Sequence, residues 1–352
     1  MAIEISGDLM EGGGQILRTS VTLAAITGKK VRVKQIRANR PNPGLRRQHI
    51  TGILAAASLT NSNVKGLQVG SQSFEYDPQQ LEGGEFRYDV GTAGSVSLVI
   101  QTLIPIALWA EEPARVELTG GTDVKWSPPI DYLRFVYFPV LSKILGAKIV
   151  LKLRQRGHYP KGGGKVVLEV FPLEKRDYRI DLKSAGSPSI IQGISHCVKL
   201  PPHVAQRQAQ SASQYLRDRG LEVGNISIET YPRTADPHWG SGSGITLYSE
   251  MEKGSILGGD SIGERGKKAE IVGKKAAMNL LSAIESSAAV DRHLGDMLIP
   301  FMVLSPYSSI FSVSEVTSHL LTNIEIVKRF SEREFHVQGK LGEKGLVECL
   351  KS

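Results

Sequence analysis

The segment VDRHLGDMLIPFM, residues 290–302, holds the side chain best suited to nucleophilic chemistry. His293 offers an imidazole that is largely neutral, and therefore nucleophilic, near physiological pH. It directly precedes apolar residues at helical spacing, which predict one buried helix face: Leu294, Met297, Leu298, Phe301 and Met302. Asp296 lies three residues further on, close to His293 on the helix surface. A histidine at the boundary of a core is also a common packing residue, so this segment alone leaves both interpretations open.

Two glycine-rich segments, EGGGQILR from residue 11 and GTAGSVSLVIQ from residue 91, each precede an apolar helix. Backbone N–H groups at a helix N-terminus attract phosphate, and glycine lets the backbone approach a ligand closely. Glu11 can bind a hard cation, and Arg18 follows in the same helix. Gln101 is an amide in an otherwise apolar helix and needs a partner, either a nucleotide or a neighbouring backbone group. Tight turns are the alternative explanation of the glycines.

A third segment, IRANRPNPGLRRQH at residues 36–49, concentrates positive charge. Arg37 and Arg40 lie on its Pro- and Gly-rich loop, and Gln48 lies just inside the following helix. Guanidinium groups match phosphate oxygens in bidentate fashion, so the loop predicts a contact with the end of a polynucleotide. A second basic loop, RGHYPKGGGKV at residues 156–166, joins two strands and offers another phosphate contact. Solvated surface charge is the alternative for both loops.

The composition fits a globular protein with an anionic partner. The chain has 352 residues and a formal net charge of +8, which favours nucleic acid or nucleotide ligands. Two cysteines, Cys197 and Cys349, do not make a disulfide framework. The longest apolar run, residues 95–110, is too short to span a bilayer, and the N-terminus lacks an apolar signal core. We therefore expect a cytoplasmic protein without a membrane partner.

Several site motifs are missing from the sequence. It contains no P-loop, no dinucleotide-binding glycine motif, and no paired cysteine or H-E-x-x-H motif that would indicate zinc. A K-x-D-G motif for lysine adenylylation is also missing, which leaves His293 as the best candidate for a covalent nucleotide. We interpret His196, Cys197 and His203 as packing residues on a strand and a helix start.

The elements that must position these residues recur along the chain. Glycine-opened helices begin at residues 11 and 91, 80 residues apart, and second helices begin at residues 44 and 131, 87 residues apart. This agreement predicts an internal repeat, with a third copy formed by helices at 291–305 and 312–330. Residues 184–266 have their own order of strand, helix and two strands, which predicts an inserted small α/β domain. We expect a catalytic domain from residues 1–183, with two modules, and 267–352, with the third.

The five motifs EGGGQILR, IRANRPNPGLRRQH, GTAGSVSLVIQTLIP, RGHYPKGGGKV and HLGDMLIPFM occur in an order that closely resembles the RNA 3'-terminal phosphate cyclase family. The resemblance runs from Gly7 to about Leu304. It implies an α+β fold of three repeated βαβαββ modules, related to the enolpyruvyl transferases, with an inserted small α/β domain.

The resemblance also implies an ATP-dependent reaction. His293 would attack the α-phosphorus of ATP, release pyrophosphate and form an AMP-histidine intermediate. The AMP would pass to an RNA 3'-terminal phosphate, and the neighbouring 2'-OH would close a 2',3'-cyclic phosphate and release AMP. Asp296 would orient the nucleophile. The remaining implied roles are ATP binding by Gln101, Pro128 and Arg18, binding of the RNA end by Arg37, Arg40 and Gln48, and binding of Mg²⁺ (or Mn²⁺) by Glu11.

One residue departs from the family pattern, because Met297 stands where a glutamine usually follows the aspartate.

Two other functions remain to be weighed. A non-catalytic, cyclase-like ribosome-assembly protein shares the fold but lacks the nucleophile, and an enolpyruvyl transferase shares the modules but needs no covalent nucleotide. The sequence leaves open whether the inserted domain is a lid, an RNA platform or a spacer, and it does not indicate the oligomeric state.

Overall fold

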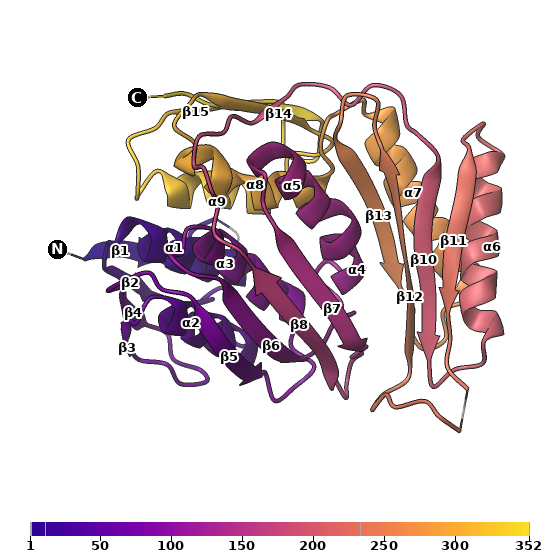
Figure 1. The fold of residues 1–352 in the computed structure, drawn as a ribbon, viewed down its shortest axis with the longest axis horizontal. Coiled ribbons are helices and arrows are strands. Elements are labelled where there is room, and N and C mark those ends of the chain that lie inside the picture. Colours follow the sequence, from indigo (N-terminus) through magenta and orange to yellow (C-terminus); the bar gives the residue numbers. More distant parts are fainter. Residues whose placement is uncertain (1, 11, 233, 352) are drawn as a thin grey trace.

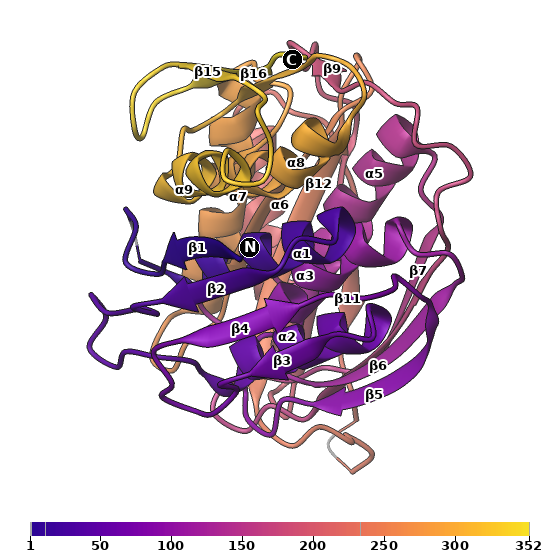
Figure 2. The same cartoon turned by 90° about the vertical axis from the view of Figure 1, so that its left-hand side faces the viewer.

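The computed structural model describes residues 2–10, 12–232 and 234–351, which form a mixed α+β fold. Within them lie four sheets of four strands each. The first unit contains β1 (Ile3–Ser6), α1 (Gly14–Thr27), β2 (Val31–Lys34), α2 (Arg47–Leu59), β3 (Asn63–Lys65) and β4 (Phe74–Asp77). Its strand order is β1-β2-β4-β3, with β1 parallel to β2 and the other pairs antiparallel. Figure 2 shows this sheet in front of α1 and α3.

The second unit repeats this strand order with longer strands. It contains β5 (Gly84–Asp89), α3 (Val96–Leu108), β6 (Ala114–Gly120), α4 (Ile130–Tyr132), the π-helical turn η1 (Leu133–Tyr137), α5 (Phe138–Leu145), β7 (Ile149–Gln155) and β8 (Gly164–Val170). The order is β5-β6-β8-β7, with β5 parallel to β6 and the other pairs antiparallel. The helix predicted from residue 131 is thus present, but it is divided into three segments.

The third unit is interrupted in the chain. It contains β9 (Asp181–Leu182), α8 (Arg292–Leu304), β14 (Ser309–Val313), α9 (Ser318–Val327), β15 (Phe335–Gln338) and β16 (Gly345–Cys349). The strand order is β15-β16-β14-β9, and β9 pairs parallel with β14. A strand that precedes the long intervening segment therefore pairs with one that follows it.

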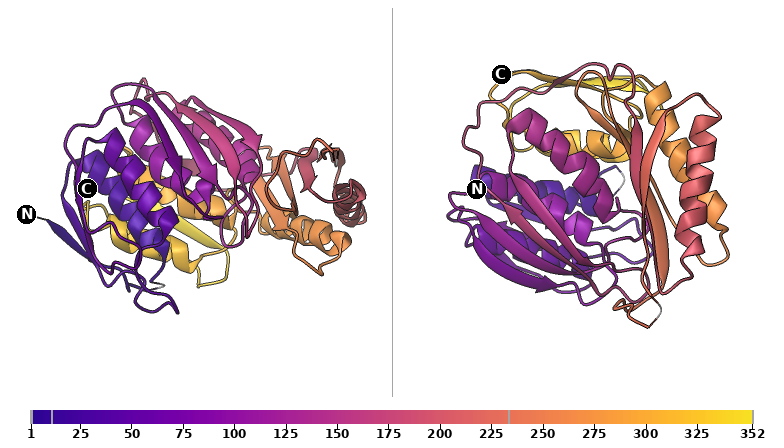
Figure 3. Two further views of the ribbon diagram at one scale, coloured as in Figure 1. Left: turned by 90° about the horizontal axis from the view of Figure 1, so that it is seen from below. Right: turned by 45° about the vertical axis from the view of Figure 1, so that its right-hand side comes forward.

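The intervening segment forms the fourth sheet and two long helices. It contains β10 (Ile191–Val198), α6 (His203–Arg217), β11 (Val223–Glu229), β12 (Gly242–Glu250), β13 (Ile256–Ile262) and α7 (Ala269–Glu285). The order is β11-β10-β12-β13, and α6 and α7 cover the face turned away from the other units (Figures 1 and 3). The sequence analysis placed residues after Gly266 in the third module, but α7 packs with this sheet, since Val272, Ala276 and Leu280 share its hydrophobic cluster.

The main core lies between the first three sheets, where their helices meet. One hydrophobic cluster joins Leu17 of α1, Leu103 of α3 and Leu298 of α8. Figure 1 shows these helices gathered at the centre. Apolar residues occur all round α3, which is why it is buried on almost every side. Across the described ranges, no helix combines the length and apolar character needed to cross a bilayer.

Candidate functional site

His293 is the second residue of α8, and the start of this helix is held by a buried carboxylate. The N-cap residue Asp291 accepts hydrogen bonds from the backbone N–H groups of His293 (2.9 Å) and Leu294 (3.1 Å). The hydroxyl of Tyr132 donates to the same carboxylate at 2.6 Å, and the N–H of Gly258 donates to it at 2.9 Å. Groups from α4 and β13 therefore fix the backbone that carries the imidazole.

The imidazole of His293 is partly exposed and uncharged. Its side chain is 30% exposed, and its Nε2 lies 3.8 Å from a carboxylate oxygen of Asp260 on β13. The ring of Tyr132 meets it edge-on, with centroids 5.5 Å apart. Desolvation, followed by electrostatic interaction with Arg292 and then His319, lowers the pKa of His293 to about 3. The ring is therefore a neutral nucleophile at physiological pH.

Two carboxyl groups near this helix start have raised pKa values. Burial raises the pKa of Asp260 to about 7 and that of Asp296 to about 7. The carboxylate of Asp296 accepts a hydrogen bond from the hydroxyl of Thr317 at 2.5 Å. In the described part of the chain, the carboxylate recorded beside the ring of His293 is that of Asp260, which the sequence analysis did not single out. An orienting role of Asp296 stays a prediction.

An open pocket of about 310 Å³ brings three of the predicted residues together. Arg18 of α1, Gln101 of α3 and Asp296 of α8 all line it, as does Met297. The Nε2 atom of Gln101 is buried and has no hydrogen-bond partner among the described residues, so it is available to a bound ligand. The pocket is lined mainly by three helices from three different units, α1, α3 and α8.

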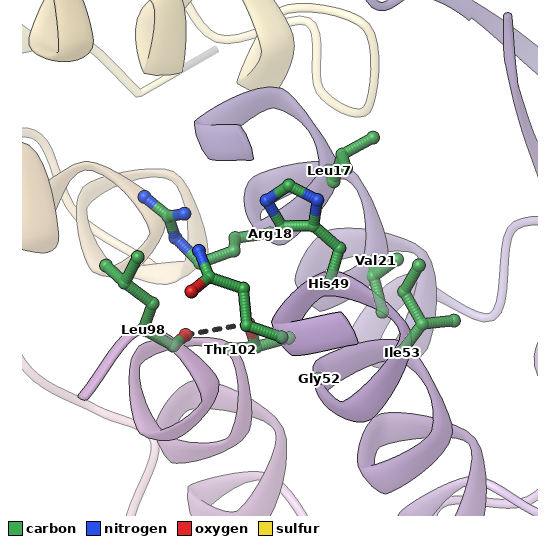
Figure 4. Close-up of a pocket in the computed structure, with 9 residues that line it drawn as sticks. Leu17, Arg18, Val21, His49, Gly52, Ile53, Leu98 and Thr102 are labelled. Atoms are coloured by element: carbon green, nitrogen blue, oxygen red, sulfur yellow. Dashed lines mark hydrogen bonds between the residues drawn. The ribbon is translucent and has the colours of Figure 1, made fainter. Parts of the chain in front are cut away.

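Arg18 also lines a second pocket, of about 280 Å³ (Figure 4). Gln48 and His49 of α2 line it together with apolar side chains of α1, α2 and α3. The side-chain oxygen of Gln48 accepts a hydrogen bond from the backbone N–H of Ser95, the N-cap residue of α3, at 2.9 Å. Gln48 therefore holds two helix starts together, a structural contact that the predicted RNA-binding role did not include.

His49 is a polar residue of this region that the sequence analysis missed. Its Nδ1 accepts a hydrogen bond from the backbone N–H of Arg46 at 3.1 Å. Burial, followed by the charges of Arg18 and Arg37, lowers its pKa to about 3. A Cβ atom at Gly14 would lie 2.5 Å from the Nε2 of His49. The glycine therefore leaves the space that the His49 ring occupies. The local sequence gave no signal for this contact, since it joins α1 to α2.

The arginine loop forms a compact positive cluster. Arg37 has a φ of 53° and donates hydrogen bonds to the backbone oxygens of Asn42 (2.8 Å) and Gly44 (3.2 Å). Burial, and then repulsion by Arg46 and Arg40, lowers the pKa of Arg37. Guanidinium groups that repel one another in this way gain stability when an anion binds between them.

The glycine-rich loops of the second unit also meet. A Cβ atom at Gly162, in the β7–β8 hairpin, would lie 2.8 Å from the backbone oxygen of Thr92. One at Gly94 would lie 3.1 Å from the Cβ of Gln48. The segments GTAG, PKGGG and the start of α2 are therefore adjacent. Pro128 is buried between β6 and α4 and lines neither pocket, and Glu11 lies outside the described residues.

Comparison with known proteins decides the family. A family profile described as "RNA 3'-terminal phosphate cyclase" matches residues 9–337. The chain belongs to the RNA 3'-terminal phosphate cyclase family. Among the relatives of this cyclase family are a protein of Staphylothermus marinus, 49% identical over 98% of this chain and 97% of its own, and one of Ignicoccus hospitalis, 48% identical over 97% and 96%. A Methanopyrus kandleri relative is 45% identical over 98% of both chains. Each is named RNA 3'-terminal phosphate cyclase, so the predicted enzyme class is confirmed.

Proposed function

We propose that this protein uses ATP to convert an RNA 3'-terminal phosphate into a 2',3'-cyclic phosphate through a covalent His293–AMP intermediate. The observation that carries the proposal is the state of His293, a neutral imidazole at the firmly held start of α8. The pocket lined by Arg18 and Gln101 adjoins the same helix through Asp296 and Met297. A nucleophile, a cationic group for phosphate and an amide donor thus come from three helices that pack together.

In the first step, a ring nitrogen of His293 attacks the α-phosphorus of ATP. A P–N bond forms at the nitrogen that carries the lone pair, the P–O bond breaks with its electron pair leaving on pyrophosphate, and the one N–H proton on the other ring nitrogen can pass to a nearby base. Asp260 lies 3.8 Å from Nε2, and its pKa of about 7 allows it to accept and return that proton. Arg18 provides positive charge for the phosphate groups.

In the following steps, an oxygen of the RNA 3'-phosphate attacks the AMP phosphorus and frees His293. The adjacent 2'-OH then attacks the activated 3'-phosphorus, closes the ring and expels AMP. We assign the RNA end to the cluster of Arg37 and Arg40, because the positive charges of Arg46 and Arg40 both act on Arg37 and together attract an anion. Mg²⁺ or Mn²⁺ would offset the charge of the leaving pyrophosphate. The predicted ligand Glu11 lies outside the described residues, so this assignment stays a prediction, as does the cytoplasmic location.

We further propose that the three units with the strand order first-second-fourth-third are repeats of one βαβαββ module, as in the enolpyruvyl transferases. Their matching order and their single parallel pair support this. Because α7 packs on the inserted sheet, we place the end of the inserted domain near Glu285 instead of residue 266.

A non-catalytic ribosome-assembly protein is the alternative, and the presence of a neutral, supported His293 argues against it. The test is incubation with ATP labelled at the α-phosphate. We expect an acid-labile protein label that is lost in His293→Gln and retained in His336→Gln, which changes an exposed histidine of β15. RNA with a 3'-phosphate should then chase the label and yield the cyclic end. Absence of the label, or its retention in His293→Gln, would contradict the proposal.

The RNA-end assignment is tested separately with Arg40→Ala. This variant should retain most of the protein labelling but transfer AMP to RNA more slowly. Equal loss of both steps would place Arg40 at the ATP instead. Transfer at the normal rate would remove Arg40 from the RNA site.

A further inference from the structure

Three buried side chains from three separate elements converge where the inserted sheet meets the second unit. Asp123 follows β6, His158 lies in the β7–β8 hairpin, and His196 lies on β10. One potential ligand atom from each residue lies within 4.8 Å of the other two. All three residues are at most 3% exposed. Ionisable side chains are rarely buried together in this way unless they bond to one another or to a ligand.

The imidazole nitrogens in this cluster lack partners among the described residues. Neither Nδ1 nor Nε2 of His196 makes a hydrogen bond, and neither does Nε2 of His158. His196 Nε2 lies 3.9 Å from Asp123 Oδ1, a distance too long for a hydrogen bond. Asp123 and His158 face each other in an isolated β-bridge, which holds their side chains in the same place. Buried nitrogens without partners are costly, so the arrangement calls for a ligand.

The charges around the cluster favour a cation. The buried guanidinium of Arg156 contacts three carboxylates, those of Asp123 (3.3 Å), Asp131 (2.7 Å) and Glu229 (2.8 Å). Arg134, at the partly exposed edge, also pairs with Asp131. The three carboxylates outnumber the two guanidinium groups, so this set of side chains carries a net negative charge.

We propose that Asp123, His158 and His196 bind a divalent transition-metal ion of the zinc class. Two imidazoles and one carboxylate form a ligand set typical of zinc and its neighbours, whereas Mg²⁺ prefers oxygen ligands and retained water. Ligand atoms around tetrahedral zinc lie roughly 3.3 Å apart, given metal–ligand bonds of about 2.0–2.1 Å. The three side chains would close by about 1.5 Å or less, within the reach of small side-chain rotations.

A further buried histidine of the intervening segment, His238, has its Nδ1 2.7 Å from a carboxylate oxygen of Asp236, and its Nε2 has no partner within the described ranges. It is not in the group whose ligand atoms lie within 4.8 Å of one another, so the proposed site rests on Asp123, His158 and His196.

The site would join two layers of the fold. Asp123 and His158 belong to the second unit, whereas His196 and His238 belong to the inserted segment. The two layers already touch here, since a Cβ atom at Gly242 would overlap the ring of His158. A bound ion would therefore hold the inserted domain at a fixed position on the catalytic domain, a structural role separate from ATP and RNA binding.

The test is metal binding by the full-length protein. After removal of metal with a chelator, we expect one Zn²⁺ per chain to bind in the presence of millimolar Mg²⁺, and Co²⁺ to give the visible absorption of a tetrahedral site. Zn²⁺ at about 100 times its Kd should raise the Tm by roughly 4 °C for a chain of this size. His158→Gln and His196→Gln should each weaken binding at least 10-fold. The matched control His203→Gln changes an exposed histidine of the same segment and should bind normally.

Three results would overturn the proposal: no stoichiometric Zn²⁺, unchanged binding in both ligand variants, or equal competition by Mg²⁺. If the variants do not fold, the test is anomalous scattering at the zinc absorption edge, measured on crystals of the unaltered protein grown with Zn²⁺. A peak about 2.0–2.2 Å from the three side chains supports the site, and its absence refutes it. These readouts do not involve nucleotide transfer, so they stand apart from the test of His293.

Discussion

Lowering the pH from 7.5 to 5.0 should leave the imidazole of His293 unprotonated. Its surroundings lower its pKa to about 3, so about 1% of the rings would carry a second proton at pH 5.0. An ordinary histidine with a pKa of about 6.5 would be about 97% protonated at that pH. The two cases differ roughly 30-fold in the fraction of neutral nucleophile. Arg292→Gln removes one cause of the shift and should raise the pKa of His293 without restoring its ordinary value.

The direct assay is NMR of protein with ¹³C-labelled histidine, in which His293→Gln assigns the ring signal. Single-turnover labelling by ATP measures the same property through the rate. Because Asp260 and Asp296 have pKa values of about 7, they titrate within this range. The rate is therefore compared in Asp260→Asn and Asp296→Asn, where those titrations are removed singly.

A ring signal from His293 that titrates with a midpoint above about 6 would refute the reasoning. It would mean that the partial exposure of the side chain outweighs desolvation and the nearby positive charges. A flat ring signal with a falling rate would instead assign the pH dependence to the carboxyl groups.

Three further predictions concern the support of the site. His49 is neutral in the folded protein but takes up a proton below pH 6.5 when the protein is unfolded. Between pH 7.5 and 5.0, the free energy of unfolding of the unaltered protein should therefore fall by about 2 kcal/mol more than that of His49→Gln. Urea unfolding that shows the same loss in both proteins would contradict this account. Gly14→Ala places a Cβ 2.5 Å from the His49 ring and should cost about 1–3 kcal/mol in thermal unfolding, whereas Gly52→Ala meets its nearest atom at 3.5 Å and should be tolerated; equal effects would discount the close approach. Tyr132→Phe removes a donor from the buried Asp291 and should cost about 1–3 kcal/mol and slow self-labelling, which an unchanged Tm and rate would disprove.

The sequence predicted the helices that carry the candidate site because their apolar spacing and glycine starts are local signals. The helix expected at residues 91–110 is α3, Val96–Leu108, and it begins later because Ser95 caps it by accepting a hydrogen bond from the N–H of Leu98 at 3.3 Å. Strand β13 and helix α7 were not predicted. The strand segment ILGGDSI has two adjacent glycines and little alternation, so its extended form depends on pairing with β12.

The candidate site was predictable only where its residues belong to recognisable segments. Arg18, Gln101 and Asp296 were named from the sequence, and one pocket brings them together. Asp260 and Tyr132 could not be found in this way, because each reaches His293 from another part of the chain. The same limit applied to His196, which was interpreted as a packing residue from its place on a strand; Asp123 and His158, which lie beside it in the structure, are far from it in sequence and gave no local signal.

The contact between β13 and the start of α8 bears on attempts to shorten this protein. Gly258 supplies an N–H to Asp291, and its missing side chain leaves room for the ring of Tyr132, which a Cβ atom would approach within 2.7 Å. A truncated chain that joins β9 directly to α8 would lose both features at once. The segment between β9 and α8 therefore supports the start of α8. A shortened version of the enzyme must keep at least the edge strand β13 and the sheet with which it pairs.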